Sequence, residues 1–208
     1  AFTPYPIHSE VYRDRFECPC VVASNDGLQW KYPLYKEYID DLTDEQIQEM
    51  DYFSDPELVM CNGFLYMYYR LSVGGIGLSQ KNVHVYRKRT KDGVTWSERE
   101  NIHFKINSSN FTVISPTIIY EDNKFLLWFV SGEKFHRKVY RMISNDGITW
   151  DNLLECNLQE YRYDPWHIDC KHNGNNYYLT IYDMTEKLVV LESNDGISFD
   201  VLKTVLVP

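Results

Sequence analysis

Acidic side chains stand at the beginnings of several β-rich segments of this 208-residue chain. Asp55 and Glu57 flank a proline, and Asp164 and Asp169 enclose a short run that contains His167. Two carboxyl groups that face one another can divide acid and base work, because one donates a proton while the other acts as base or nucleophile. Cleavage of a glycosidic bond requires this chemistry, so these positions are the first candidates for a site.

One further carboxylate, Glu17, lies directly before another β-rich run, in Arg15-Phe16-Glu17-Cys18-Pro19. The predicted catalytic set is Asp55, Glu17 and Asp169, with Asp55 paired with one of the other two. The predicted ligand-binding set is Asp164, Trp166, His167, Arg70, Glu57 and Thr117. Each has a structural interpretation as well, since Asp-Pro often opens a strand, tryptophan is often a core residue, and Arg70 can pair with a neighbouring aspartate.

The elements that position these groups follow from an internal repeat of the form Ser-x-Asp-Gly-x-x-Trp. Its four copies are Ser24–Trp30, Thr90–Trp96, Ser144–Trp150 and Ser193–Phe199, and the Asp positions are 66, 54 and 49 residues apart. Asp-Gly suits a tight hairpin turn, because Gly tolerates positive φ and Asp bonds its own backbone two residues on. The aromatic ring that ends each copy is expected to pack back over the turn. A period near 50 residues is typical of β-propeller blades, which hold about four strands each.

A second series of short turns runs in phase with the first. Asn62-Gly63, Asp122-Asn123 and Asn173-Gly174 each separate a β-rich run from an aromatic run, which predicts hairpins. Within the third hairpin, His167 and Asp169 alternate with Ile168 and should share one face of a strand. Each blade is therefore predicted as strand, turn, strand, strand, Asp-Gly turn, strand. The predicted fold is all-β, a single β-propeller domain over 1–208 with antiparallel four-stranded blades at about 1–33, 52–100, 113–152 and 163–202.

Only one stretch departs from this β pattern. Residues 40–50 contain Thr43 three residues before Gln46, the spacing of a helix capping box, followed by helix-forming residues. We predict a short acidic helix there, which is either a solvated excursion on the surface or a gate over a site.

Composition limits the partners and the location. A net charge of −9 argues against nucleic acid as a partner, and no run of 18 apolar residues is present that would span a membrane. The five cysteines, an odd number without metal-type spacing, are predicted to be buried free thiols. No cofactor is predicted, although the His and Asp side chains of a central channel would also suit a divalent cation. The apolar opening at Ala1 looks like the interior of a strand and suggests a chain cut from a longer one.

At the level of these motifs the chain resembles the five-bladed β-propellers of glycoside hydrolase families 43, 32, 68 and 130. The resemblance rests on the Asp-Pro strand starts, the Asn-Gly hairpins before Tyr-rich strands, and turns similar to the Asp-boxes of sialidases. It implies a sugar bound at the mouth of the channel and acidic residues drawn from separate blades. Asp55 matches the Asp-Pro blade start, and Glu17 in Glu-Cys-Pro matches the acid motif of the family 32 type. Fewer than five blades can be counted, so further domains or chains are expected to complete the ring.

Several functional classes remain open from the sequence. One is a glycoside hydrolase or phosphorylase, which predicts a carboxylate with a raised pKa beside the channel. Another is a non-catalytic carbohydrate-binding or structural propeller, such as an adhesin or a virus tail or surface module, in which the acids are used in salt bridges to Arg70, Arg141 or Arg162. A protein-binding scaffold is the third. The carbohydrate classes favour an extracellular, cell-surface or virion location over the cytoplasm.

Overall fold

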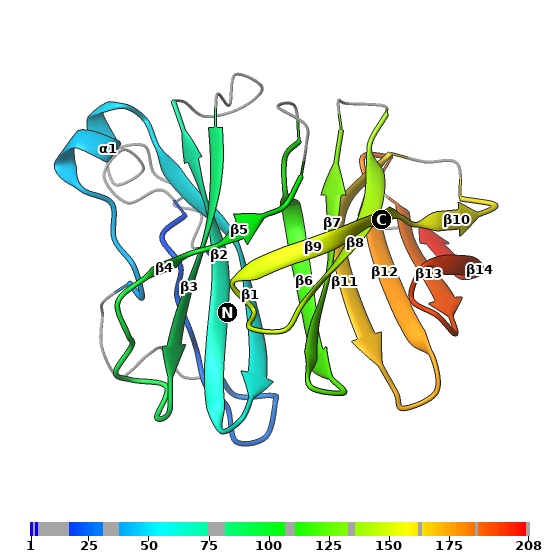
Figure 1. The fold of residues 1–208 in the computed structure, drawn as a ribbon, viewed down its shortest axis with the longest axis horizontal. Helices are drawn as coiled ribbons and strands as arrows, with labels where there is room; N and C mark the ends of the chain where they lie inside the picture. The colour runs from blue at the N-terminus through cyan, green and yellow to red at the C-terminus, as the bar shows by residue number, and fades with distance from the viewer. Residues whose placement is uncertain are drawn as a thin grey trace. The chain divides into compact units, whose positions relative to one another are not determined.

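The computed structural model of the chain is built almost entirely of β-strands. It describes residues 1, 3, 17–30, 38–74, 82–106, 111–132, 136–161, 164–185 and 187–206. The chain divides into two compact units, unit 1 at 1–102 and unit 2 at 103–208, and each is described by itself (Figure 1). The predicted blade at 1–33 lies largely outside the described residues.

Unit 1 holds one sheet with the strand order β1-β2-β3-β4, antiparallel throughout. Its elements are α1 (Asp44–Gln48), β1 (Tyr52–Cys61), β2 (Phe64–Val73), β3 (Asn82–Thr90) and β4 (Glu100–Asn101). The aromatic strand β2 is buried along most of its length, as a continuous apolar run predicts for a strand covered on both faces. A core cluster forms around it from Cys18, Leu42, Phe53, Met67, Tyr69 and Leu71.

The helix α1 falls within the predicted insertion at 40–50, and its capping box is confirmed. The Thr43 hydroxyl accepts the Gln46 N–H at 3.2 Å, and the Gln46 side chain accepts the Thr43 N–H at 3.0 Å. Leu42 and Ile47 pack against the core cluster, while Asp44 and Glu45 are exposed. The helix is therefore anchored by its apolar residues and presents its acidic ones to solvent. None of the helices in the described part of the chain is long and apolar enough to cross a membrane.

Unit 2 holds two five-stranded sheets, ordered β5-β9-β8-β7-β6 and β10-β14-β13-β12-β11. The strands of the first are β5 (His103–Phe104), β6 (Ile114–Glu121), β7 (Lys124–Ser131), β8 (Lys138–Ser144) and β9 (Thr149–Glu155). Those of the second are β10 (Asn157–Gln159), β11 (Pro165–His172), β12 (Tyr177–Asp183), β13 (Lys187–Ser193) and β14 (Ser198–Leu206).

Four antiparallel strands of each sheet in unit 2 follow the predicted blade pattern. The fifth strand, β5 or β10, comes from the linker that precedes the blade and pairs in parallel with the outermost strand, β9 or β14. The sequence patterns did not indicate these short strands, because two or three residues are too few to show a periodicity.

Two of the three predicted hairpin turns have the expected two-residue form. Both central residues have positive φ, 51° and 76° at Asn62-Gly63 and 47° and 58° at Asp122-Asn123, as a type I′ turn requires. The third connection is longer than predicted. It runs over residues 173–176, where the Asn173 side chain accepts the N–H groups of Asn175 and Asn176 at 3.0 and 2.9 Å.

All four Asp-Gly turns share one hydrogen-bond pattern. The Asp carboxylate accepts the N–H groups two and three residues on at 2.8–2.9 Å, and the leading hydroxyl accepts the Gly N–H at 2.8–3.0 Å. The bonds from the Thr95 and Val94 N–H groups hold the pKa of Asp92 at about 2. These aspartates are tied into their own turns, as the sequence predicts.

The rings that end these turns differ in their packing. Trp150 and Phe199 are fully buried, whereas Trp30 is 60% exposed and its indole N–H donates to the Gly27 carbonyl at 3.2 Å. The Trp30 ring thus folds back on its own turn, as predicted, but remains exposed to solvent. The turn forms from its own hydrogen bonds, but ring burial needs neighbouring strands, and these vary between copies.

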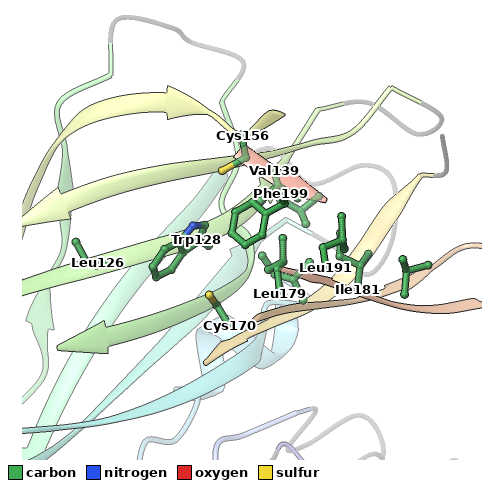
Figure 2. Packing of buried hydrophobic residues seen from close by; sticks show 12 residues of the cluster. Leu126, Trp128, Val139, Cys156, Cys170, Leu179, Ile181, Leu191 and Phe199 are labelled. Atoms are coloured by element: carbon green, nitrogen blue, oxygen red, sulfur yellow. The ribbon is translucent and has the colours of Figure 1, made fainter. Parts of the chain in front are cut away.

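The core of unit 2 joins its two sheets. Figure 2 shows Trp128 of β7 close to Phe199 of β14, with Leu179, Ile181 and Leu191 of the same sheet as Phe199 grouped beside them. The Trp128 indole N–H donates to the Gly196 carbonyl at 2.7 Å, so the last Asp-Gly turn docks on the preceding blade.

Candidate functional site

The predicted blade starts are built as β-bulges. In β1 the bulge falls between Ser54 and Glu57, and in β6 it falls between Ile114 and Thr117. The bulged residues before proline, Asp55 and Ser115, have positive φ of 51° and 48°. Bulges re-aim the side chains that they carry. Ser115 has the same backbone conformation as Asp55, so the bulge is a feature of the blade. The bulge of unit 1 differs in carrying a carboxylate.

Arg70 of β2 binds the Asp55 carboxylate through its Nη1 atom. The two side chains are 5% and 14% exposed, respectively. A guanidinium this close favours the ionised form of a carboxylate. The Nε and Nη2 atoms of Arg70 are also buried and find no hydrogen-bond partner among the described residues. Glu57, two residues further along, is partly buried opposite Tyr68.

Glu17 shares this environment, and its pKa is raised from 4.5 to about 7. Burial is the largest cause, the negative charge of Asp55 adds to it, and Arg70 opposes it. The Glu17 backbone is left-handed, with φ of 51°. Non-glycine residues hold such conformations only where the surroundings enforce them. Unit 1 therefore brings a carboxyl with a pKa of about 7, which is about half protonated at pH 7, beside a carboxylate that is ion-paired with an arginine.

In unit 2, Asp164 forms a second buried ion pair, with Arg137 at 2.7 Å. The Arg137 guanidinium lies 4.4 Å from the centre of the Trp166 ring, and His167 meets the same ring edge-on at 5.6 Å. Trp166 is partly buried and His167 is exposed. Of the predicted residues, Asp164 and Trp166 thus contact Arg137, and His167 lies against the Trp166 ring. The sequence analysis missed Arg137, because a lone arginine in a loop carries no local signal.

Asp169 stands on the exposed face of β11, where it pairs with Lys171 at 2.6 Å and accepts the Thr117 hydroxyl at 3.2 Å. The predicted alternation of β11 is present, with Ile168 and Cys170 buried and His167 and Asp169 exposed. Asp169 lies in unit 2, whereas Glu17 and Asp55 lie in unit 1.

The Thr117 hydroxyl also accepts the backbone N–H of Cys170 at 3.1 Å, and the Ser115 hydroxyl accepts that of Ile168 at 3.0 Å. The side chains of β6 therefore satisfy the free backbone edge of β11. This is a structural task for Thr117 beside its predicted contact with a ligand.

No cofactor site emerges from the described residues. Among them, no three His, Cys, Asp or Glu side chains are arranged to hold a metal ion. The five cysteines are all buried and unbridged. A surface hollow of about 330 Å³ lies beside the last Asp-Gly turn, around Glu192, Asp195 and Asp200, and includes none of the predicted site residues.

No family model matches the chain. Two uncharacterized proteins from two strains of Mycobacterium tuberculosis are 26% identical to it over 155 residues, which is 72% of this chain and 50% of each relative. The chain thus spans about half the length of the curated relatives that it matches.

Similar solved structures include an N-acetylgalactosamine deacetylase from F. plautii in complex with blood group B trisaccharide. Its TM-score is 0.77 at 22% identity, over 99% of this chain and 65% of that one. A family 117 glycoside hydrolase from Zobellia galactanivorans has a TM-score of 0.68 at 16% identity, over 90% and 55% of the two chains. The β-xylosidase RS223 has a TM-score of 0.58 at 12% identity, over 87% and 64%. These likenesses confirm the predicted fold: the chain has the β-propeller architecture of glycoside hydrolases.

Proposed function

We propose that unit 1 carries the acid and base pair of a glycan-hydrolysing enzyme, with Glu17 as general acid and Asp55 as nucleophile or general base. The observation that carries the proposal is the Arg70-bound carboxylate of Asp55 near the carboxyl of Glu17, whose pKa is raised to about 7. Environments that push two carboxyl groups toward opposite protonation states mark the acid and the base of a catalytic pair.

The chemistry is a hydrolysis in which every atom is accounted for. Glu17 gives its proton to the glycosidic oxygen as the bond from that oxygen to the anomeric carbon breaks. Asp55 either attacks the anomeric carbon or removes a proton from the attacking water. If Asp55 attacks, water then displaces it from the anomeric carbon, and Glu17 regains its proton from that water. If Asp55 instead takes the water proton, it releases this proton to solvent and Glu17 is reprotonated from solvent. Arg70 favours the charged form of Asp55 at the start of the cycle.

Removal of an N-acetyl group from an amino sugar is a second candidate reaction. It is favoured by the likeness to the F. plautii deacetylase, which extends over 99% of this chain. The same two groups would serve, with Asp55 activating water against the amide carbonyl and Glu17 protonating the departing amine. Acetate is the product that distinguishes this reaction from glycoside cleavage.

The non-catalytic alternative also has support in the ion pairs. Asp55 pairs with Arg70 and Asp164 with Arg137, as expected if the acids only stabilise the fold. Arg141 instead lies over the Trp128 ring, and Arg162 falls outside the described residues. The raised pKa of Glu17 supports catalysis over this alternative, because a pKa of about 7 lets this carboxyl both give and take a proton near neutral pH.

The test is a panel of chromogenic glycosides and N-acetylated oligosaccharides, with release of the chromophore and of acetate measured separately. Glu17→Gln and Asp55→Asn should each lower kcat by about 10²–10⁴-fold, the usual contribution of acid–base catalysis. Asp169→Asn is the matched exposed carboxylate and should retain activity. Glycan binding without turnover would favour a binding module, and the absence of any glycan response would exclude both carbohydrate functions.

A further inference from the structure

Strand β2 sends two neighbouring side chains to two different carboxylates. Arg70 binds Asp55, and the adjacent Tyr69 donates its hydroxyl to Asp40 at 2.6 Å. Successive residues of a strand point to opposite faces, so the two contacts lie on the two faces of the same strand. Asp40 belongs to the segment 38–43 that leads into α1, and we call this segment the strap.

Asp40 gathers three groups of unit 1 around one carboxylate. Besides the Tyr69 hydroxyl, it faces Lys88 of β3 at 3.5 Å and Arg99 at 3.4 Å, and its own side chain is 13% exposed. The Lys88 ammonium also donates to the Ile39 carbonyl at 2.9 Å. The strap is therefore fastened to β2, to β3 and to the residue before β4. The Asp40–Lys88 pair, with side chains 13% and 14% exposed, is screened by solvent less than a surface pair, whereas the Arg99 side chain is 38% exposed.

The strap in turn holds the segment that carries Glu17. The Ile39 N–H donates to the Pro19 carbonyl at 2.9 Å, and the Cys18 thiol donates to Asp41 at 3.7 Å. Cys18 is fully buried in the core cluster that Leu42 of the strap and Tyr69 of β2 also join. Glu17 immediately precedes Cys18, so its backbone position is set by contacts that lead directly to the strap.

We propose that Asp40 is a positioning residue that, through the strap, fixes Glu17 against Asp55. This inference rests on the proposed function, but it concerns a residue that touches neither the substrate nor the reacting atoms. The path runs from Asp40 through the neighbouring Ile39 to Pro19, and from there to Glu17. Strand β2 supplies both ends of the arrangement, since Tyr69 holds the strap and Arg70 holds Asp55. A single strand, β2, thereby sets the separation of the Glu17 and Asp55 carboxyl groups.

The test is Asp40→Asn, with the pKa of Glu17 followed by carbon-13 NMR of its carboxyl group. The amide still accepts from Tyr69 but no longer attracts Lys88 and Arg99. As the strap loosens, Glu17 gains solvent, and its pKa should fall by about one pH unit toward its ordinary value. The pH at which Glu17-dependent turnover declines on the alkaline side should fall by the same amount, and Asp40→Glu should restore part of both.

The matched control is Glu100→Gln, which breaks the 3.0 Å ion pair with Arg87 on the same sheet without touching the strap. It should leave the pKa of Glu17 unchanged. An unchanged pKa in Asp40→Asn, or an equal fall in Glu100→Gln, would overturn the proposal. If Asp40→Asn does not fold, Lys88→Met decides instead, because it removes the tie to Ile39 and should lower the pKa in the same direction. The NMR readout needs no turnover, so a protein without glycan activity would refute the proposed function while leaving this inference to be judged by the pKa.

Discussion

Replacing Glu17 by glutamine should flatten the pH dependence of the stability of unit 1. The pKa of Glu17 rises from 4.5 to about 7 on folding, because burial and the Asp55 charge both disfavour its ionised form. The folded state therefore holds this proton more tightly than the unfolded chain does. The resulting stabilisation is fully present below about pH 4.5 and is lost as the pH rises through about 7. Glutamine carries no such proton and so lacks this dependence.

The magnitude follows from the same pKa values. A difference of about 2.5 pH units corresponds to a ceiling of about 3 kcal/mol, at about 1.36 kcal/mol per unit. Since Glu17 is only partly buried, solvent screening reduces this ceiling, and we expect about 1–2 kcal/mol.

The assay is native-state hydrogen exchange of the β2 amides in urea, which reports the opening of unit 1 alone, measured from about pH 5 to pH 8. The free energy of unfolding of the wild type should fall by about 1–2 kcal/mol relative to that of Glu17→Gln over this interval. Asp169→Asn removes an exposed carboxylate of unit 2, so its free energy of unfolding should change with pH as that of the wild type does. Parallel pH profiles for the wild type and Glu17→Gln would refute the reasoning.

Three substitutions in unit 2 test its packing by urea denaturation. Gly196→Ala should destabilise by about 2–4 kcal/mol, because its φ is +69° and a Cβ would lie 2.9 Å from a buried tryptophan ring. Gly93→Ala at the matching turn has open space around the Cβ and should cost about 1–2 kcal/mol. Equal losses in the two variants would contradict the clash. Thr117→Val should cost about 1–3 kcal/mol by leaving a backbone N–H of β11 unpaired, and Thr117→Ser should recover most of it. Arg137→Met should cost about 3–5 kcal/mol by removing the cation that neutralises the buried Asp164 carboxylate. Adding Asp164→Asn should reduce the loss; an additive double variant would argue against the pair.

Local turn chemistry was the part of the fold that the sequence predicted best. An Asp-Gly turn closes with its own side-chain and backbone groups, so Asp26 and Asp195 form the same bonds in different units. The Asn62-Gly63 turn likewise depends only on its two central residues. Ring burial was less predictable, because Trp30 and Trp150 end turns that share Ser-Asn-Asp-Gly but have different neighbours.

The candidate site shows the same difference between local features, which the sequence predicted, and long-range contacts, which it did not. Patterns nominated Asp55 together with either Glu17 or Asp169, since each is an acid near a strand start, and did not choose between the last two. Their electrostatic surroundings differ through residues far along the chain: Arg70 reaches Asp55 from the next strand, and Lys171 holds Asp169 at the surface. Such partners depend on strand register and burial, which a sequence pattern does not encode. For the same reason, the sequence alone does not give the pKa of Glu17.

The short parallel strands β5 and β10 have a practical consequence for protein engineering. Each belongs in space to the blade that follows it, although the sequence repeat leaves it in the linker between two blades. A blade cut at the repeat, so that it begins at Ile114, would lack β5. The edge of β9 would then be unpaired, and an unpaired edge is a template for aggregation. Excised or transplanted blades of this chain should therefore begin at His103 or Asn157, so that each blade includes the short parallel strand that pairs with its own outermost strand.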